Sequence, residues 1–351
     1  MTGASLLKLD NGVFVAVMLA ALCVVTAAVN PGFLSVATVF DTLRSLTVVG
    51  ILGMGVLLVM VAGGIDVSFP AIAALSSYVS VTVFTAWGWG GPVLAIYGLA
   101  VVLGLALGLL NGVLISAFRL PALIVTLGTS SLIYGFNLFF VGSQDLFNVP
   151  RSIGAFSRAS LLTITDPGGR SHALHPLVLL FAVVAVLMAW FLRYTTTGRG
   201  IYAFGGSREA AERVGLPVRR LELLVFAVAG GLAALAGMTQ VVFFRNANPG
   251  ALSGSELDVI AAVVLGGVSV TGGRGSVGGA LLGLTFVTVM TTSLVMLGIP
   301  AAWQKVFVGI ALLLGISLVA SRMARARAQA PVPFSRMDGD DGHGDGRRAA
   351  V

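Results

Sequence analysis

One stretch of the sequence decides the fold class: residues 44–86 read RSLTVVGILGMGVLLVMVAGGIDVSFPAIAALSSYVSVTVFTA. Two apolar runs flank a short break at residues 63–68, and the only charged residues are Arg44 and Asp66. A helix that crosses a bilayer needs about 20 consecutive apolar residues, and each run approaches that length. The stretch therefore predicts two successive membrane-spanning helices.

The rest of the chain repeats this pattern. Of its 351 residues, 57% are hydrophobic and 10% are charged, whereas a soluble domain is about 45–50% apolar and about 25% charged. Nine charges fall within residues 193–222, ten within 322–348 and none within 67–118. The composition excludes a soluble enzyme, a secreted disulfide scaffold and a disordered protein. It indicates an all-α, polytopic membrane protein.

Apolar runs separated by polar, glycine or proline breaks predict about ten crossings, which make residues 1–321 a transmembrane domain. The predicted spans are residues 13–29, 44–63, 68–86, 92–117, 121–140, 174–192, 223–244, 256–271, 277–297 and 304–321. Residues 142–173 form a polar loop on the periplasmic side. Residues 322–351 lose all apolar periodicity and are expected to be a disordered cytoplasmic tail, to which no function is assigned.

The basic residues predict the orientation. In the ten-span arrangement, fifteen of the 21 Lys and Arg residues lie on one side and six on the other. The positive-inside rule places the richer side, with both termini, in the cytoplasm. The net charge of +7 therefore reports orientation in membrane lipid and does not indicate nucleic-acid binding.

Metal and cofactor sites are not expected. Cys23 is the only cysteine, and it lies inside an apolar run. The three histidines have no second ligand at a spacing typical of metal sites.

Residues 194–222 form the one sizeable hydrophilic stretch within the transmembrane domain, and a short helix is predicted over residues 208–214. Its signals are an N-cap, an acid in the first turn, good helix formers, a basic residue near the end and a C-terminal glycine: Ser207, Glu209, Ala210 and Ala211, Arg213 and Gly215. This helix is either an amphipathic interfacial element or an element that inserts into a cleft of a cytoplasmic partner.

Three segments carry a resemblance to a known family. They read GGIDVS at residues 63–68, GRGIYAFGGSREAAERVG at 198–215, and ELDVIAAVVLGG with TGGRGS at 256–267 and 271–276. Together, and in this order, they resemble the signatures of permeases of sugar-type ABC importers, over most of residues 40–320. The chain departs from the family pattern at Phe69 and Pro70, where Val-Gly is usual.

The resemblance implies a permease of the ribose, galactose, rhamnose and autoinducer-2 group in the bacterial inner membrane. Such permeases work as homodimers or heterodimers with two cytoplasmic ATPase subunits and a periplasmic or lipid-anchored sugar-binding protein. It also implies that the helix over 208–214 couples to the ATPase. The sequence lacks the Gly-x-x-x-x-Gly-Lys-Ser/Thr motif, so the chain is expected to be a transport subunit, not an enzyme, with the ATPase on another chain.

Polar side chains within apolar spans are candidates for the substrate pathway, because they are costly there. The candidates are Asp66, Ser68, Asn111, Asn137 and Gln240. Asp66 and Ser68 have an alternative role in capping the third helix, and the amides could instead form interhelical hydrogen bonds.

Glycines in the spans favour close helix packing. The spacing Gly104-x-x-x-Gly108-x-x-x-Gly112 and the pair Gly279 and Gly283 have this pattern. By contrast, Gly63-Gly64 and Gly266-Gly267 interrupt apolar segments in both halves of the chain, which points to a transport pathway.

Three other functions remain open. A branched-chain amino-acid ABC permease would want an unpaired basic residue in its pathway, and no span clearly contains one. A secondary transporter usually carries several ionisable groups inside the membrane, whereas Asp66 is nearly alone. An intramembrane enzyme would need a nucleophile with its base or a ligand cluster, and neither is found.

Overall fold

A computed structural model describes residues 11–166, 168–300, 303, 305–310 and 313. Its α-helices are α1 (Asn11–Val29), α2 (Val36–Val61), α3 (Phe69–Ala86), α4 (Val93–Phe118), α5 (Ala122–Phe136), α6 (Arg151–Phe156), α7 (Leu177–Tyr194), α8 (Thr196–Gly206), α9 (Arg208–Arg213), α10 (Val218–Phe244), α11 (Glu256–Leu265) and α12 (Val277–Met296). The 3-10 helix η2 (Pro31–Leu34), the π-helix η3 (Asn137–Val141) and the strands β1 (Leu162–Thr165) and β2 (Ser171–Leu174) complete it.

Within these residues, eight helices are long and apolar enough to cross a membrane: α1, α2, α3, α4, α5 with η3, α7, α10 and α12. They correspond to the first seven and the ninth predicted spans. The eighth, predicted over 256–271, was predicted too long, because α11 ends at Leu265 and the backbone turns at Gly266 and Gly267. Most of the tenth span and the whole predicted tail lie outside the described residues.

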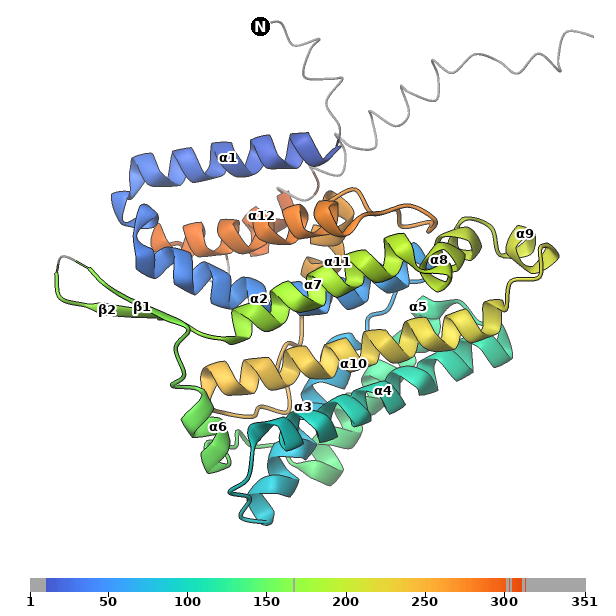
Figure 1. Cartoon of the computed structure of the whole chain (residues 1–351), viewed down its shortest axis with the longest axis horizontal. Coiled ribbons are helices and arrows are strands. Elements are labelled where there is room, and N and C mark those ends of the chain that lie inside the picture. The colour runs from blue at the N-terminus through green and yellow to red at the C-terminus, as the bar shows by residue number, and fades with distance from the viewer. Residues whose placement is uncertain (1–10, 167, 301–302, 304, 311–312, 314–351) are drawn as a thin grey trace, which may run out of the picture.

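The long helices lie roughly along one direction (Figure 1). The β1–β2 hairpin projects at one end of them, and α8 and α9 lie at the opposite end. This arrangement is the one expected of two polar segments on opposite faces of a membrane.

Helix α2 is the most enclosed of the spans, whereas α1 is the most exposed. Ser35 caps the start of α2, and its Oγ accepts a hydrogen bond from the N–H of Thr38 at 3.3 Å. Helix α10 packs along α4 and also contacts α2 and α3. The core therefore has α2 and α10 at its centre.

Small residues allow α4 and α10 to approach closely, as the glycine spacing predicts. A methyl group at Gly108 would overlap the carbonyl oxygen of Phe226 and lie 3.0 Å from the Cα of Gly230. A methyl at Gly283 would likewise overlap the carbonyl oxygen of Ala262 on α11. The predicted role of these glycines in helix packing is confirmed.

We expect Gly108→Ala to destabilise the protein by about 1–3 kcal/mol, because an added methyl must push α10 away from α4. Thermal unfolding of the purified protein in detergent measures this. Gly98→Ala is the matched control, since Gly98 lies on the same helix with no other atom within 4 Å of the added carbon. Equal melting temperatures for the two variants would contradict the expectation.

Several predicted boundaries were wrong. Helix α2 starts at Val36 instead of residue 44, since Ser35 caps it, and α10 starts at Val218 instead of residue 223. Helix α7 covers Leu177–Tyr194 instead of 174–192. The hydrophilic stretch between spans is therefore shorter than 194–222, and most of it is helical.

The structure fits the predicted all-α polytopic fold, and the loop over 142–173 adds one short antiparallel hairpin to it. Leu162 pairs with Leu174, and Thr165 pairs with Ser171. The β-branched run from Thr163 to Thr165 favours an extended backbone, and the turn that follows contains two glycines. These four-residue strands add no layer to the helical fold.

Candidate functional site

Helix α9 forms where the sequence predicts it, over Arg208–Arg213. Ser207 is extended, with φ −158° and ψ 107°, and its Oγ accepts from the N–H of Ala210 at 3.3 Å. Gly215 closes the turn by donating from its N–H to the carbonyl of Glu212 at 3.0 Å, with φ +80°. The predicted capping of this helix is confirmed.

The side chains on the outer face of α9 are exposed. The side chains of Glu209 and Arg213 are 85% and 81% exposed, and their charged atoms lie 3.8 Å apart. Ala210 is also exposed, whereas Ala211 is buried against the body of the protein. Such a helix has one face anchored and one face free for contact.

Arg208 anchors α9 to α10, a contact that the sequence analysis missed. Its guanidinium forms a two-pronged ion pair with the buried carboxylate of Glu222, with Nη2 3.1 Å from Oε2, and its Nε lies 3.1 Å from Oε1 of Glu212. The hydrogen bonds that Arg208 donates to Glu222 raise the pKa of Arg208 above its usual value. The i, i+4 spacing of Arg208 and Glu212 was visible in the sequence, but the pairing with Glu222 was not.

A cavity of about 490 Å³ opens beside α9. Its lining includes Gly63 and Gly64 from the α2–α3 turn, Pro121 from the α4–α5 turn, and Arg208 and Glu222. The first and second signature segments, which are far apart in the sequence, therefore border one space.

A neighbouring groove of about 560 Å³ is basic. Its lining contains four arginines, Arg119, Arg208, Arg219 and Arg220, and one acidic residue, Glu212. The surface around α9 therefore presents positive charge beside the mixed charges of the helix itself.

Asp66, Ser68 and Asn111 form one buried network. Oδ1 of Asp66 accepts from the backbone N–H of Ser68 at 2.7 Å and from its hydroxyl at 2.6 Å. The amide of Asn111, on α4, donates to the Ser68 hydroxyl at 2.8 Å. Within the described residues, Oδ1 of Asn111 has no hydrogen-bond partner. The network joins the α2–α3 turn to α4.

Asn137 and Gln240 take no part in this network. The Asn137 amide donates to the carbonyl of Pro249 at 3.2 Å, in the segment between α10 and α11. Two of the buried side-chain oxygens that accept no hydrogen bond in the described part of the chain are Oδ1 of Asn137 and Oε1 of Gln240. The predicted pathway residues thus fall into two groups, one at the α2–α3 turn and α4, and one on η3 and α10.

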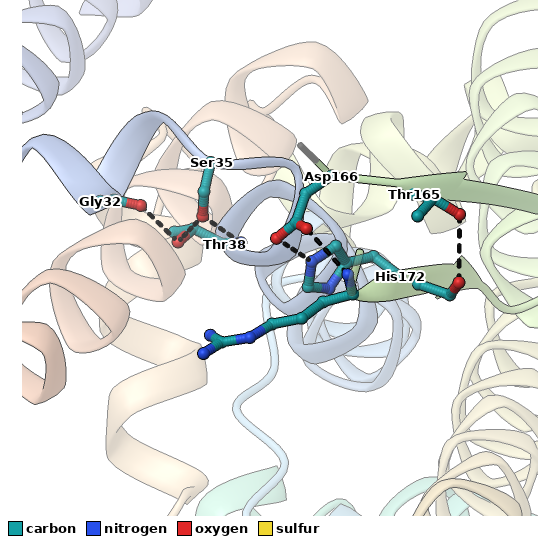
Figure 2. A network of polar contacts seen from close by, with 8 residues as sticks. Gly32, Ser35, Thr38, Thr165, Asp166 and His172 are labelled. Carbon is teal, nitrogen blue, oxygen red and sulfur yellow. Dashed lines mark hydrogen bonds and ion pairs between the residues drawn. The ribbon is translucent and has the colours of Figure 1, made fainter. Parts of the chain in front are cut away.

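The hairpin at the opposite end carries its own polar contacts. Figure 2 shows Asp166 facing His172, whose Nε2 lies 3.4 Å from Oδ2 of Asp166. The N–H of Arg170 donates to Oδ1 of Asp166 at 2.8 Å, and this bond lowers the pKa of the carboxyl. Across the residues that the structure describes, no three His, Cys, Asp or Glu side chains come close enough together to hold a metal ion.

The similarity of the chain to known proteins covers both α9 and the predicted pathway residues. A family model described as "Branched-chain amino acid transport system / permease component" matches residues 38–316. The chain belongs to this permease family. A relative, the "Autoinducer 2 import system permease protein LsrC" of Enterobacter sp. (strain 638), is 35% identical over 317 residues, which cover 89% of this chain and 88% of the relative.

The protein of the same name from Escherichia coli (strain K12 / DH10B) is 34% identical over 302 residues, 84% of each chain. No solved structure shows significant similarity to this chain. The three signature segments lie within the matched residues, and the resemblance to permeases of sugar-type ABC importers is confirmed.

Proposed function

We propose that this chain is the permease subunit of an ATP-driven importer that takes up a small, sugar-like polyhydroxylated molecule. Its membership of the permease family assigns the transport role. The names of the relatives, which are autoinducer 2 import permeases, support a sugar-like substrate for this chain over a branched-chain amino acid.

Arg44 bears on the amino-acid alternative. Because α2 begins at Val36, Arg44 lies inside the helix and not at its edge. However, it donates to the carbonyl of Phe243 and stacks over the Phe243 ring at 4.8 Å. A guanidinium engaged in this way is a poor receptor for a substrate carboxylate, which favours an uncharged substrate.

The proposed assembly contains a second permease subunit, identical or different, two cytoplasmic ATPase subunits and a periplasmic or lipid-anchored binding protein. The proposed location is the bacterial inner membrane, with both termini in the cytoplasm and α9 on the cytoplasmic side. The count of basic residues supports this orientation.

The observation that carries the ATPase-coupling role is the geometry of α9. One face of the helix is anchored by Arg208 and by buried Ala211, and the other presents Glu209, Ala210 and Arg213. An anchored helix that protrudes from the membrane domain can transmit the movement of a docked partner to the spans.

For the substrate pathway, we propose separate roles for the two groups of polar residues. Among the described residues, the side-chain oxygens of Asn137 and Gln240 have no hydrogen-bond partner, so they can accept hydrogen bonds from sugar hydroxyls. Asp66 and Ser68 hold the α2–α3 turn, and Asn111 combines a structural amide with a free oxygen.

The decisive experiment is uptake by proteoliposomes that contain the chain with its ATPase, supplied with the sugar-binding protein. We expect the liganded binding protein to stimulate ATP hydrolysis, and uptake to require ATP. Uptake that persists in vesicles without an ATPase would overturn the proposal in favour of a secondary transporter.

Two substitutions test the role of α9. We expect Glu209→Arg and Gly215→Pro each to weaken ATPase association about ten-fold or more, because the first reverses a charge on the free face and the second breaks the end of the helix. Proline cannot adopt the φ of +80° found at Gly215, and it removes the N–H that bonds Glu212. Co-purification of the ATPase at graded concentrations measures the effect.

Gly169→Pro is a matched control for Gly215→Pro. Gly169 also has a positive φ, +78°, and donates to the residue three positions earlier at 3.0 Å, but it lies in the hairpin at the opposite end of the molecule. Association should remain unchanged in this control. Normal association in both α9 variants would remove the coupling assignment.

A further inference from the structure

Two turns and the end of helix α8, which lie far apart in the sequence, meet backbone to backbone at Gly63, Gly272 and Gly205, which we call the glycine junction. Gly63 follows α2, Gly205 lies at the end of α8, and Gly272 lies between α11 and α12. A methyl group at Gly272 would lie 2.6 Å from the Cα of Gly63 and would overlap the carbonyl oxygen of Gly205. No side chain fits between these three segments.

The backbones at the glycine junction also approach closely around Gly205. A methyl at Gly205 would overlap the carbonyl oxygen of Val61 and lie 3.0 Å from the carbonyl carbon of Ala62. Gly63 and Gly272 both have φ +84°, a conformation that glycine adopts without the penalty of a Cβ. The sequence at all three positions is therefore matched to the close approach.

Hydrogen bonds hold the three segments together. The N–H of Gly273 donates to the carbonyl of Val61 at 2.9 Å. The Tyr202 hydroxyl, on α8, donates to the carbonyl of Gly275 at 2.8 Å. The end of α2 and helix α8 are thus both bonded to the α11–α12 turn.

The junction stands between the two parts of the proposed machinery. Gly205 lies two residues before Ser207, the N-cap of α9, whereas Gly63 lies three residues before Asp66 in the buried network that reaches α4. A contact between backbones has no rotamers that could absorb a displacement, and packed protein interiors transmit strain.

We propose that the glycine junction transmits the movement of the docked ATPase from α8 and α9 directly to the α2–α3 turn and the α11–α12 turn, so that these segments move as one unit. This inference rests on the proposed function and adds the residues through which coupling passes. Gly63, Gly205 and Gly272 are positioning residues. They act on the pathway through the spans that they join.

The experiment compares Gly272→Ala with Gly88→Ala in the reconstituted importer, with ATPase association, basal ATP hydrolysis, stimulated hydrolysis and uptake as readouts. Gly272 lies outside α8 and α9, so association and basal hydrolysis should stay close to wild type. We expect uptake and stimulation by the liganded binding protein to fall about ten-fold, a typical size for coupling between sites. Gly88 has φ +61° but nothing within 4 Å, so it controls for backbone strain alone.

A second pair approaches the junction from α8. Gly205→Ala should produce the same uncoupling, whereas Gly206→Ala should behave as wild type, because its methyl would lie 3.9 Å from the nearest atom, the Cα of Gly273. Wild-type uptake in Gly272→Ala and Gly205→Ala would overturn the inference. Loss of association in proportion to uptake would also overturn it, since that result indicates a purely structural role.

Tyr202→Phe keeps the inference testable if the alanine variants do not fold. It removes one hydrogen bond of the junction without adding volume, and we expect stimulated hydrolysis to fall about five-fold, at the low end of coupling effects. Unchanged stimulation would then overturn the inference. If the wild-type chain shows no ATP-dependent uptake, the proposed function itself fails, a result distinct from coupling that survives in the variants.

Discussion

Asp66→Ala is expected to reduce uptake about a hundred-fold, whereas Asp66→Asn retains most of it. The carboxylate uses a single oxygen, Oδ1, to accept both bonds from Ser68, and an asparagine presents the same oxygen. Alanine instead leaves two buried donors of Ser68 without an acceptor, at about 1–3 kcal/mol each. This loss is a large part of the 5–15 kcal/mol that typically separates the folded and unfolded states.

Uptake by reconstituted vesicles and thermal unfolding in detergent together test this prediction. Asp41→Ala is the control, because Asp41 is an exposed acid near the start of α2. If Asp66→Asn lost uptake as completely as Asp66→Ala while its melting temperature stayed at the wild-type value, the negative charge itself would act in transport. The result therefore separates a direct role for Asp66 in the pathway from a role in shaping the turn.

Arg208→Ala is expected to weaken ATPase association about a hundred-fold and to lower the melting temperature by about 5 °C. The substitution leaves the Glu222 carboxylate buried without a cation, which costs about 3–5 kcal/mol in a fully buried pair. The Arg208 side chain is 39% exposed, so screening by solvent reduces the expected cost to about 2 kcal/mol. The larger effect on association follows because α9 loses its anchor on α10.

The double variant Arg208→Ala with Glu222→Leu separates these two effects. Removal of the buried charge should restore the melting temperature, while association stays weak, because α9 is still unanchored. Arg213→Ala is the control for stability, since its pair with Glu209 is exposed and contributes little. Recovery of both stability and association in the double variant would show that the ion pair does not position α9.

The sequence predicted the long helices well, because a bilayer demands continuous apolar runs that can be read without knowledge of neighbours. It also predicted α9, since Ser207 and Gly215 act through local backbone bonds. It did not predict α8, whose residues include four glycines. Glycine disfavours an isolated helix, and α8 persists because residues such as Ile201 and Phe204 are buried against the core.

The predicted pathway residues show the same division. The sequence could identify Asp66, Asn111 and Gln240 as polar groups in apolar surroundings, but it could not pair them. Asp66 joins Asn111 through Ser68, whereas Gln240 remains outside their network. Contacts between residues more than forty positions apart depend on how helices pack, and apolar periodicity carries no information about that.

By itself, then, the sequence determined that this protein is a polytopic membrane permease, where most of its long apolar helices lie and where the short helix α9 begins and ends. Each of these features follows from local chemistry: apolar length, caps and signature segments. Only the tertiary structure decided that Arg208 pairs with Glu222 and that Gly63, Gly205 and Gly272 meet. These contacts form when α2, α8, α10 and the α11–α12 turn pack together, because only then do groups far apart in the chain come within bonding distance.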